Sequence, residues 1–189
     1  YDSYGNLSTV TDARGYQTTN DYDTTYKLFL IKITDALTYT REFTYDPWLA
    51  QILTSKDQNA QVTETQYDAL GRITKVIAPL DSTTEPTQEF SYDLSSVPNK
   101  TTTKIKSSVP GQTFTQLIIY SFADGLGRGI QRRSPVEDST KQVVTGVVEF
   151  DSRGQVKKEW TLFFDDTSTS YRTPTQMGTS TKPNVQFTY

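Results

Sequence analysis

Cysteine and histidine are both absent from the 189 residues, and methionine occurs once. Without cysteine the chain has no disulfide, no thiolate nucleophile and no Cys-ligated zinc. Without histidine it lacks the Ser-His-Asp and Cys-His arrangements, the HExxH zinc site and the side chain that usually titrates near neutral pH. We therefore expect no enzymatic activity and no bound cofactor or metal.

Strong charge and long apolar segments are also missing. The net charge is −3, from 22 acidic and 19 basic residues, and the basic clusters are limited to Arg128 with Arg132-Arg133 and to Lys157-Lys158. This charge balance does not suggest a nucleic-acid partner. The apolar run Leu117–Tyr120 is far too short to span a bilayer. The sequence starts at Tyr1 without Met, and we expect it to be a segment of a larger protein.

The residues that are abundant favour β-structure. Threonine makes up about one residue in six, and there are 12 tyrosines and 9 phenylalanines. Thr, Tyr, Val, Ile and Phe suit half-buried pleated surfaces, whereas strong helix formers are few and scattered. A disordered chain would not carry 12% aromatic residues. The composition predicts an all-β protein.

Aspartates recur along the first half of the chain at intervals of 10 to 13 residues, and most begin a turn-like tetrapeptide such as Asp68-Ala69-Leu70-Gly71. Aspartate suits the first position of a type I turn because its carboxylate accepts the backbone N–H two residues on. Glycine suits the fourth position, where φ is often positive, and we expect this conformation at Gly71. The spacing leaves about seven residues for a strand between turns.

The turns alternate in kind, because a tyrosine directly precedes every second aspartate in residues 1–93. An antiparallel meander places alternate turns on opposite edges of its sheet, so one edge carries a row of tyrosines, here named the aromatic edge. In the second half, Asp124 and Asp151 continue this edge with Phe122 and Phe150 in place of tyrosine. The candidate turn and repeat residues are Tyr1, Asp2, Gly5, Asp12, Gly15, Tyr22, Asp23, Tyr45, Asp46, Tyr67, Asp68, Gly71, Tyr92, Asp93, Asp124, Gly127, Phe150, Asp151 and Gly154.

The pattern predicts a single run of repeats over residues 1–189, regular over 1–93 and with longer, less regular intervals over 94–189. The composition of residues 167–183, rich in Ser, Thr, Pro and Gly, predicts a long mobile loop. The inferred strands cover residues 7–11, 16–22, 27–34, 38–45, 49–55, 61–67, 73–77, 87–92, 100–107, 113–122, 129–133, 142–150, 156–164 and 185–189.

Two segments, residues 1–15 and Tyr67-Asp68-Ala69-Leu70-Gly71-Arg72-Ile73, closely resemble the YD repeat of RHS (rearrangement hotspot) proteins. Asp124-Gly125-Leu126-Gly127-Arg128 resembles the variant found in the B-type component of bacterial insecticidal toxin complexes. The resemblance implies a long sheet that spirals into a hollow shell. In bacterial members the shell encloses a toxic polypeptide, and its partners are flanking repeats or other shell subunits. It also implies a secreted or cell-surface protein.

Other interpretations of the same residues remain open beside this resemblance. The aspartates resemble the ligands of calcium, but they lie about one per turn rather than clustered, which favours turn capping. The tyrosines could stack on sugars or bases, although their fixed place before each turn favours a structural ladder. Trp48, which follows Pro47 on a turn, is the residue we select as a possible binding site. The alternative function is therefore an extracellular binding or adhesion module for a carbohydrate or protein ligand.

Overall fold

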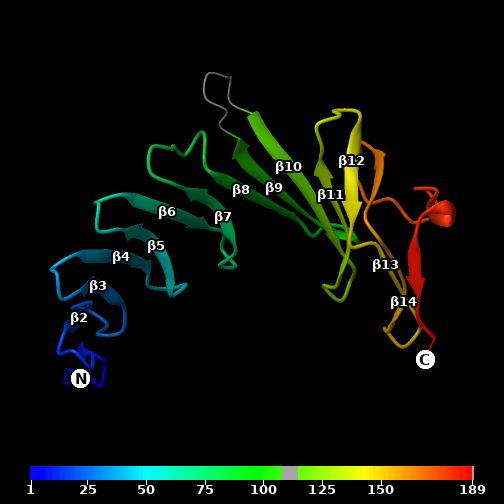
Figure 1. Ribbon diagram of the computed structural model, residues 1–189. Helices are drawn as coiled ribbons and strands as arrows, with labels where there is room; N and C mark the ends of the chain where they lie inside the picture. Colours follow the sequence, from blue (N-terminus) through cyan, green and yellow to red (C-terminus); the bar gives the residue numbers. More distant parts are fainter. Residues whose placement is uncertain (108–114, 189) are drawn as a thin grey trace. The chain divides into compact units, whose positions relative to one another are not determined.

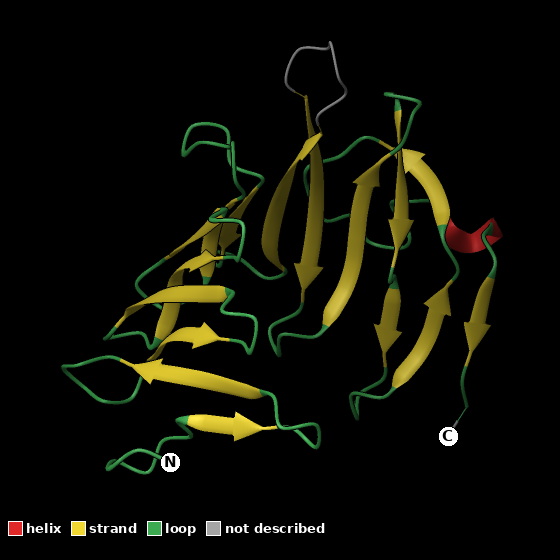
Figure 2. Cartoon of the chain, turned by 60° about the vertical axis from the view of Figure 1, so that its left-hand side comes forward, coloured by secondary structure: helices red, strands yellow, loops and turns green. Residues whose placement is uncertain are grey.

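The computed structural model describes residues 1–107 and 115–188. The start of the predicted strand at 113–122 and the terminal Tyr189 lie outside this range. The chain divides into two compact units, the first spanning Tyr1–Thr87 and the second beginning at Gln88. Figures 1 and 2 show that nearly all regular structure in both units is β-strand, which confirms the predicted all-β class.

The first unit is an antiparallel meander in which each strand pairs with the next. Among the described residues of its strands, only Ile77, at 6% exposure, is a buried apolar residue. Most others are half-buried, because a single sheet layer leaves both faces accessible. Its strands are β1 (Thr9–Thr11), β2 (Gln17–Tyr22), β3 (Leu30–Thr34), β4 (Thr40–Asp46), β5 (Gln51–Lys56), β6 (Val62–Tyr67) and β7 (Ile73–Ile77).

The second unit contains a meander and a smaller sheet. The meander runs in the order β8-β9-β10-β11-β12-β15, and the smaller sheet in the order β13-β14-β16. The meander strands are β8 (Gln88–Asp93), β9 (Asn99–Ser107), β10 (Thr115–Ala123), β11 (Gly129–Pro135), β12 (Lys141–Thr145) and β15 (Phe163–Asp166). The smaller sheet contains β13 (Val148–Phe150), β14 (Val156–Trp160) and β16 (Asn184–Gln186).

The predicted strands at 142–150 and 156–164 are each broken in two, which corrects the sequence prediction. β12 pairs with β15 in the meander, whereas β13 pairs with β14 in the smaller sheet. The same two-stranded ribbon therefore passes from one sheet to the other. The backbone turns at Gly146, whose φ is +63°. Glycine adopts this conformation without the steric cost that a β-carbon would add.

The predicted mobile loop at 167–183 is instead packed. It carries the short 3-10 helix η1 (Thr179–Thr181), and its Met177 is 5% exposed. Met177 belongs to a buried apolar cluster with Val144, Val147, Trp160 and Phe163. The cluster lies where the ribbon changes sheets, and the packed segment covers it there. Apolar side chains buried in this way supply most of the free energy that stabilises a small sheet unit.

Candidate functional site

The recurrent Asp turns share one hydrogen-bonding pattern. At Asp68, one carboxylate oxygen accepts the backbone N–H groups of Leu70 at 2.9 Å and of Arg72 at 3.0 Å. The Asp68 N–H donates to the Arg72 carbonyl, and the Gly71 N–H donates to the Asp68 carbonyl. The turns with this pattern begin at Asp2, Asp12, Asp35, Asp57, Asp68, Asp124 and Asp151. One carboxylate thus holds the whole connection between two strands.

The fourth turn position has a left-handed backbone whichever residue occupies it. Gly71 has φ +76°, and Thr38 and Ala60, at the same position of two opposite-edge turns, have φ +69° and +61°. A β-carbon is unfavourable in this conformation, so these two turns are strained relative to the glycine turns.

Gly71→Val should destabilise the protein by about 1–3 kcal/mol, because a β-branched residue is strongly disfavoured at positive φ. A Cβ at this position would meet no atom closer than 3.8 Å, so the effect isolates backbone strain from steric overlap. Gly129→Val is the control, because Gly129 begins a strand and a Cβ there would meet no atom within 4 Å. Urea denaturation of both variants measures the difference, and equal losses would contradict the turn assignment.

Hydrogen bonding lowers the pKa of several turn carboxyls. The backbone N–H of Arg72, with the Arg72 side chain, lowers the pKa of Asp68. At Asp23 desolvation raises the pKa, but backbone hydrogen bonds from Tyr26, Leu28, Phe29 and Thr25 outweigh it and bring it to about 2. Because these pKa values are lower in the folded state, the carboxylates stabilise it fully above their unfolded value of 3.8. The contribution is lost as the pH falls from there toward 2.

The aromatic edge also carries a β-bulge in most of its hairpins. Tyr45 pairs with Ile52 while the preceding Thr44 pairs with Thr54, so Leu53 is an extra residue on β5. The other extra residues, identified by the same shift in register, are Ile31, Thr74, Ile130 and Lys157. A bulge interrupts the ladder of hydrogen bonds and leaves backbone groups without a strand partner.

Tyrosines of the aromatic edge donate to backbone carbonyl groups of the preceding hairpin. The Tyr45 hydroxyl donates to the Leu30 carbonyl at 2.9 Å, and the Tyr67 hydroxyl donates to the Ile52 carbonyl at 2.9 Å. Leu30 and Ile52 each directly precede the extra residue of the previous aromatic-edge hairpin. Tyr22 makes the corresponding bond to Leu7. In the first unit, these three tyrosines each connect their hairpin to the one before it.

Tyr45→Phe should destabilise the first unit by about 1 kcal/mol, because the Leu30 carbonyl loses a hydrogen bond while the ring packing is retained. The ring itself stacks on Phe29 with centroids 4.9 Å apart, so a larger truncation would mix two effects. Hydrogen exchange of β3 and β4 measures the change. Tyr16→Phe, at an exposed position on the opposite edge, should leave the exchange unchanged. If both variants change it equally, the hydroxyl has no special role.

Successive turns of the aromatic edge also contact each other. The Asn6 side chain donates to the Lys27 carbonyl, and Leu49 lies 3.8 Å from the position of a Cβ on Gly71. In the second unit the Arg128 guanidinium lies 3.6 Å from the centre of the Phe150 ring and donates to the Gly154 carbonyl. The edge is thus a row of touching turns within each described unit.

The remaining predicted residues occupy varied positions. Trp48 is 93% exposed, and its backbone N–H donates to the Asp46 carboxylate. Tyr1 is 85% exposed and lies before β1. Asp93 accepts the N–H and hydroxyl of Ser95, although its turn lacks the shared pattern.

A buried ionic network in the second unit was missed by the sequence interpretation. The Arg133 side chain is fully buried and donates to the Asp165 carboxylate at 2.8 Å, to Gln142 and to the Asp166 carbonyl. Arg172 donates to the same Asp165 oxygen at 2.8 Å. Only the alternation of β11, in which Gln131 and Arg133 share a face, could have suggested an inward-facing arginine.

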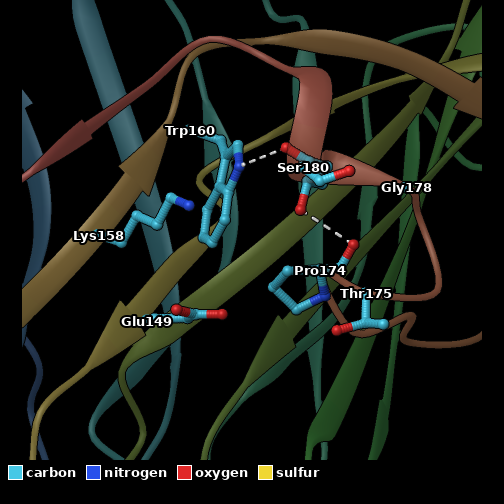
Figure 3. A pocket seen from close by; sticks show the side chains of 8 residues that line it. Glu149, Lys158, Trp160, Pro174, Thr175, Gly178 and Ser180 are labelled. Carbon is cyan, nitrogen blue, oxygen red and sulfur yellow. Dashed lines mark hydrogen bonds between the residues drawn. The ribbon is translucent and has the colours of Figure 1, made fainter.

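The smaller sheet and the packed segment enclose a pocket of about 250 Å³ (Figure 3). None of the residues in its wall is a predicted site residue; they are Glu149, Lys158, Trp160, Pro174, Thr175, Gly178, Thr179 and Ser180. The Lys158 ammonium lies 4.7 Å from the centre of the Trp160 ring, and the indole N–H donates to the Thr179 carbonyl. The indole hydrogen bond links the packed segment to β14.

Neither a metal cluster nor a membrane-spanning helix occurs in the part of the chain that the structure describes. Within residues 1–107 and 115–188, no group of three or more acidic side chains is arranged to hold a metal ion. The helical structure in the same residues includes nothing long and apolar enough to cross a membrane.

No protein-family model and no curated protein matches this sequence. Solved structures do. A crystal structure of TcdB2–TccC3 aligns with a TM-score of 0.68 and 17% identity over 85% of this chain and 10% of that one. A second crystal structure, titled TcdB2–TccC3–TEV, aligns with a TM-score of 0.68 and 14% identity over 94% of this chain and 13% of that one.

The Photorhabdus luminescens Tc holotoxin pore aligns with a TM-score of 0.65 and 14% identity over 78% of this chain and 12% of that one. The chain is therefore a meander of Asp-turn hairpins with the fold of a part of these toxin-complex proteins. This confirms the resemblance inferred from the YD motifs. The chain spans only about a tenth of the length of the structures that it matches.

Proposed function

We propose that this chain is a structural segment of an RHS-type β-shell that encloses a toxic polypeptide in a secreted or surface-exposed bacterial toxin system. Its role is to form part of the wall of the shell, with no catalytic step of its own. The observation that carries the proposal is the fold similarity to TcdB2–TccC3, which extends over 94% of this chain at a TM-score of 0.68.

The aromatic edge explains how such a wall is extended. In the first unit, two bulged hairpins present a carbonyl next to the bulge, and the next hairpin supplies a tyrosine hydroxyl to it, as Tyr45 does for Leu30 and Tyr67 for Ile52. Neighbouring repeats thus complete each other, which favours long arrays over isolated hairpins. The partners are accordingly flanking repeats or other shell subunits, together with the enclosed polypeptide.

A second candidate function is an extracellular adhesion module that recognises a protein or carbohydrate. The observation in its favour is Trp48, whose side chain is 93% exposed on a turn held by Asp46 and Pro47. Exposed aromatic residues on rigid turns are common anchors of binding surfaces.

Negative-stain imaging of the full-length polypeptide that carries these repeats separates the two candidates. The shell proposal expects a closed hollow particle with an interior polypeptide that resists protease until the particle is denatured. A particle without a lumen, in which every segment is cleaved at the same rate, would overturn the shell proposal. It would leave adhesion as the better explanation, to be tested by binding of wild type and Trp48→Ala to cell-surface glycans.

A further inference from the structure

Every turn of the aromatic edge in the first unit presents an exposed apolar side chain at an interval of 22 residues, and the turn at Asp23 also exposes Leu28 at 65%. The side chains at this interval are Tyr4, Tyr26, Trp48 and Leu70, with exposures of 65%, 57%, 93% and 74%. We name this set the tip row. The opposite edge has exposed apolar residues too, but its matching turn positions hold Arg14, Leu37 and Asn59. In the tip row, Tyr4, Trp48 and Leu70 are the second residue after the turn aspartate, whereas Tyr26 is the third residue after Asp23. Within residues 1–87, the opposite edge has no apolar row with this constant interval of 22 residues.

The tip row has a regular spacing. Successive tips are separated by two strands, which corresponds to about 9.6 Å along the edge. The turns that carry the tips touch through the contacts of Asn6 with Lys27, Phe29 with Tyr45, and Leu49 with Gly71. Because the turns are braced against one another, the row is held in place before any partner binds.

Hollows lie beside the tips. One, of about 220 Å³, is lined by Tyr26, Phe29, Tyr45 and Pro47 among others. Another, of about 540 Å³, includes Leu49, Leu53 and Tyr67 in its lining. Each hollow combines apolar side chains with carboxylates, and neither lining includes a lysine or arginine. Tips and hollows along one edge make this surface a candidate for packing against a copy of itself.

We propose that the tip row packs against the tip row of a second copy of this chain, related by a two-fold axis, so that the tips of each copy enter the hollows of the other. A two-fold contact requires such a self-complementary surface. The aromatic edge of a second copy has the same spacing of about 9.6 Å, so it stays in register with all four tips. A helix repeats its face every seven residues, or about 10.5 Å, and would drift by about 3 Å over the four tips.

This contact would bury the apolar side chains that a single sheet layer leaves exposed. Trp48 is the most exposed of them and lies between the two hollows in sequence, next to Pro47 and Leu49. Large aromatic side chains at the centre of an interface usually contribute most to its affinity. The proposal goes beyond the proposed function, because it concerns contact between copies and does not depend on what a shell encloses.

Sedimentation equilibrium of the 189-residue chain tests the proposal. We expect a monomer–dimer equilibrium below about 100 µM, and a dissociation constant raised at least about tenfold by Trp48→Ser or Leu70→Ser. Leu37→Ser is the matched control, since Leu37 occupies the same turn position as Leu70 on the opposite edge and is 69% exposed. It should change the constant by less than about twofold.

Each other outcome would overturn the proposal. A monomer at all concentrations rules out a second copy as the partner. If Leu70→Ser and Leu37→Ser raise the dissociation constant equally, the association is a non-specific hydrophobic contact of exposed leucines. A dimer that none of the three variants weakens indicates pairing through open strand edges. Since the chain has no cysteine, Thr24→Cys can also carry a single spin label per chain, at an exposed position that is neither a tip nor part of a hollow's lining. A distance between labels that disappears in Trp48→Ser, with an unchanged circular dichroism spectrum, would support the tip-row contact independently.

Discussion

Asp165→Leu is expected to destabilise the second unit by about 3–5 kcal/mol, because it leaves the fully buried Arg133 charge without its carboxylate. Arg133 makes further bonds to Gln142 and to the Asp166 carbonyl, but neither partner group carries an opposing charge. An unpaired charge in a protein interior costs far more than the net value of the pair itself.

Unfolding of the second unit can be followed by its own tryptophan. The chain has two tryptophans, Trp48 in the first unit and the buried Trp160 in the second. In a Trp48→Phe background the fluorescence in a urea titration reports on Trp160 alone. The midpoint for Asp165→Leu should fall well below that of the parent, with little change in slope.

Two control variants separate loss of charge pairing from loss of packing. Arg172→Met removes the second partner of Asp165, but Arg172 is 28% exposed, so we expect a loss of about 1 kcal/mol or less. Arg133→Met combined with Asp165→Leu removes both buried charges and should recover about half of the loss caused by Asp165→Leu. The loss of stability of the double variant is compared with the sum of the losses caused by Arg133→Met and by Asp165→Leu, each measured alone. If the two are equal, the network acts through shape and not through charge.

The hairpins could be predicted from the sequence because their signals are local. The aspartate, the glycine three residues later and the tyrosine before them determine where each turn lies, as at Tyr67, Asp68 and Gly71. Seven of the turns then share one hydrogen-bonding pattern. The alternation of tyrosine also indicated two distinct edges. The role of its hydroxyl was not evident, because the acceptor is a carbonyl 15 residues away, next to a bulge.

The packing of the second unit could not be predicted because its contacts are distant in sequence. Arg133 meets Asp165 across 32 residues, and Gln131 meets Arg172 across 41 residues. Residues 167–183 are rich in Ser, Thr and Pro, so nothing in the sequence indicated that Met177 in this segment is buried. The two long strands predicted at 142–150 and 156–164 do pair with each other, but each is broken in two. The break at Gly146 depends on how the ribbon packs against two different sheets, which the local sequence does not show.

Trp160→Ala is expected to destabilise the second unit by about 3–5 kcal/mol, the range for deleting a buried aromatic side chain. Trp160 is 4% exposed and belongs to the cluster of Val144, Val147, Phe163 and Met177. Its truncation also removes the hydrogen bond from the indole N–H to the Thr179 carbonyl, which fixes the packed segment.

Hydrogen exchange measured peptide by peptide tests this expectation and shows how far the damage spreads. Residues 163–183 and β13–β14 should lose protection, whereas β2–β6 should keep theirs, because the first unit has no residue in this cluster. Trp48→Ala is the matched control, a loss of the same side chain at 93% exposure, and should change stability by no more than about 0.5 kcal/mol. Equal loss of protection in both units after Trp160→Ala would mean that they unfold as one, and that the core of the second unit stabilises the entire sheet.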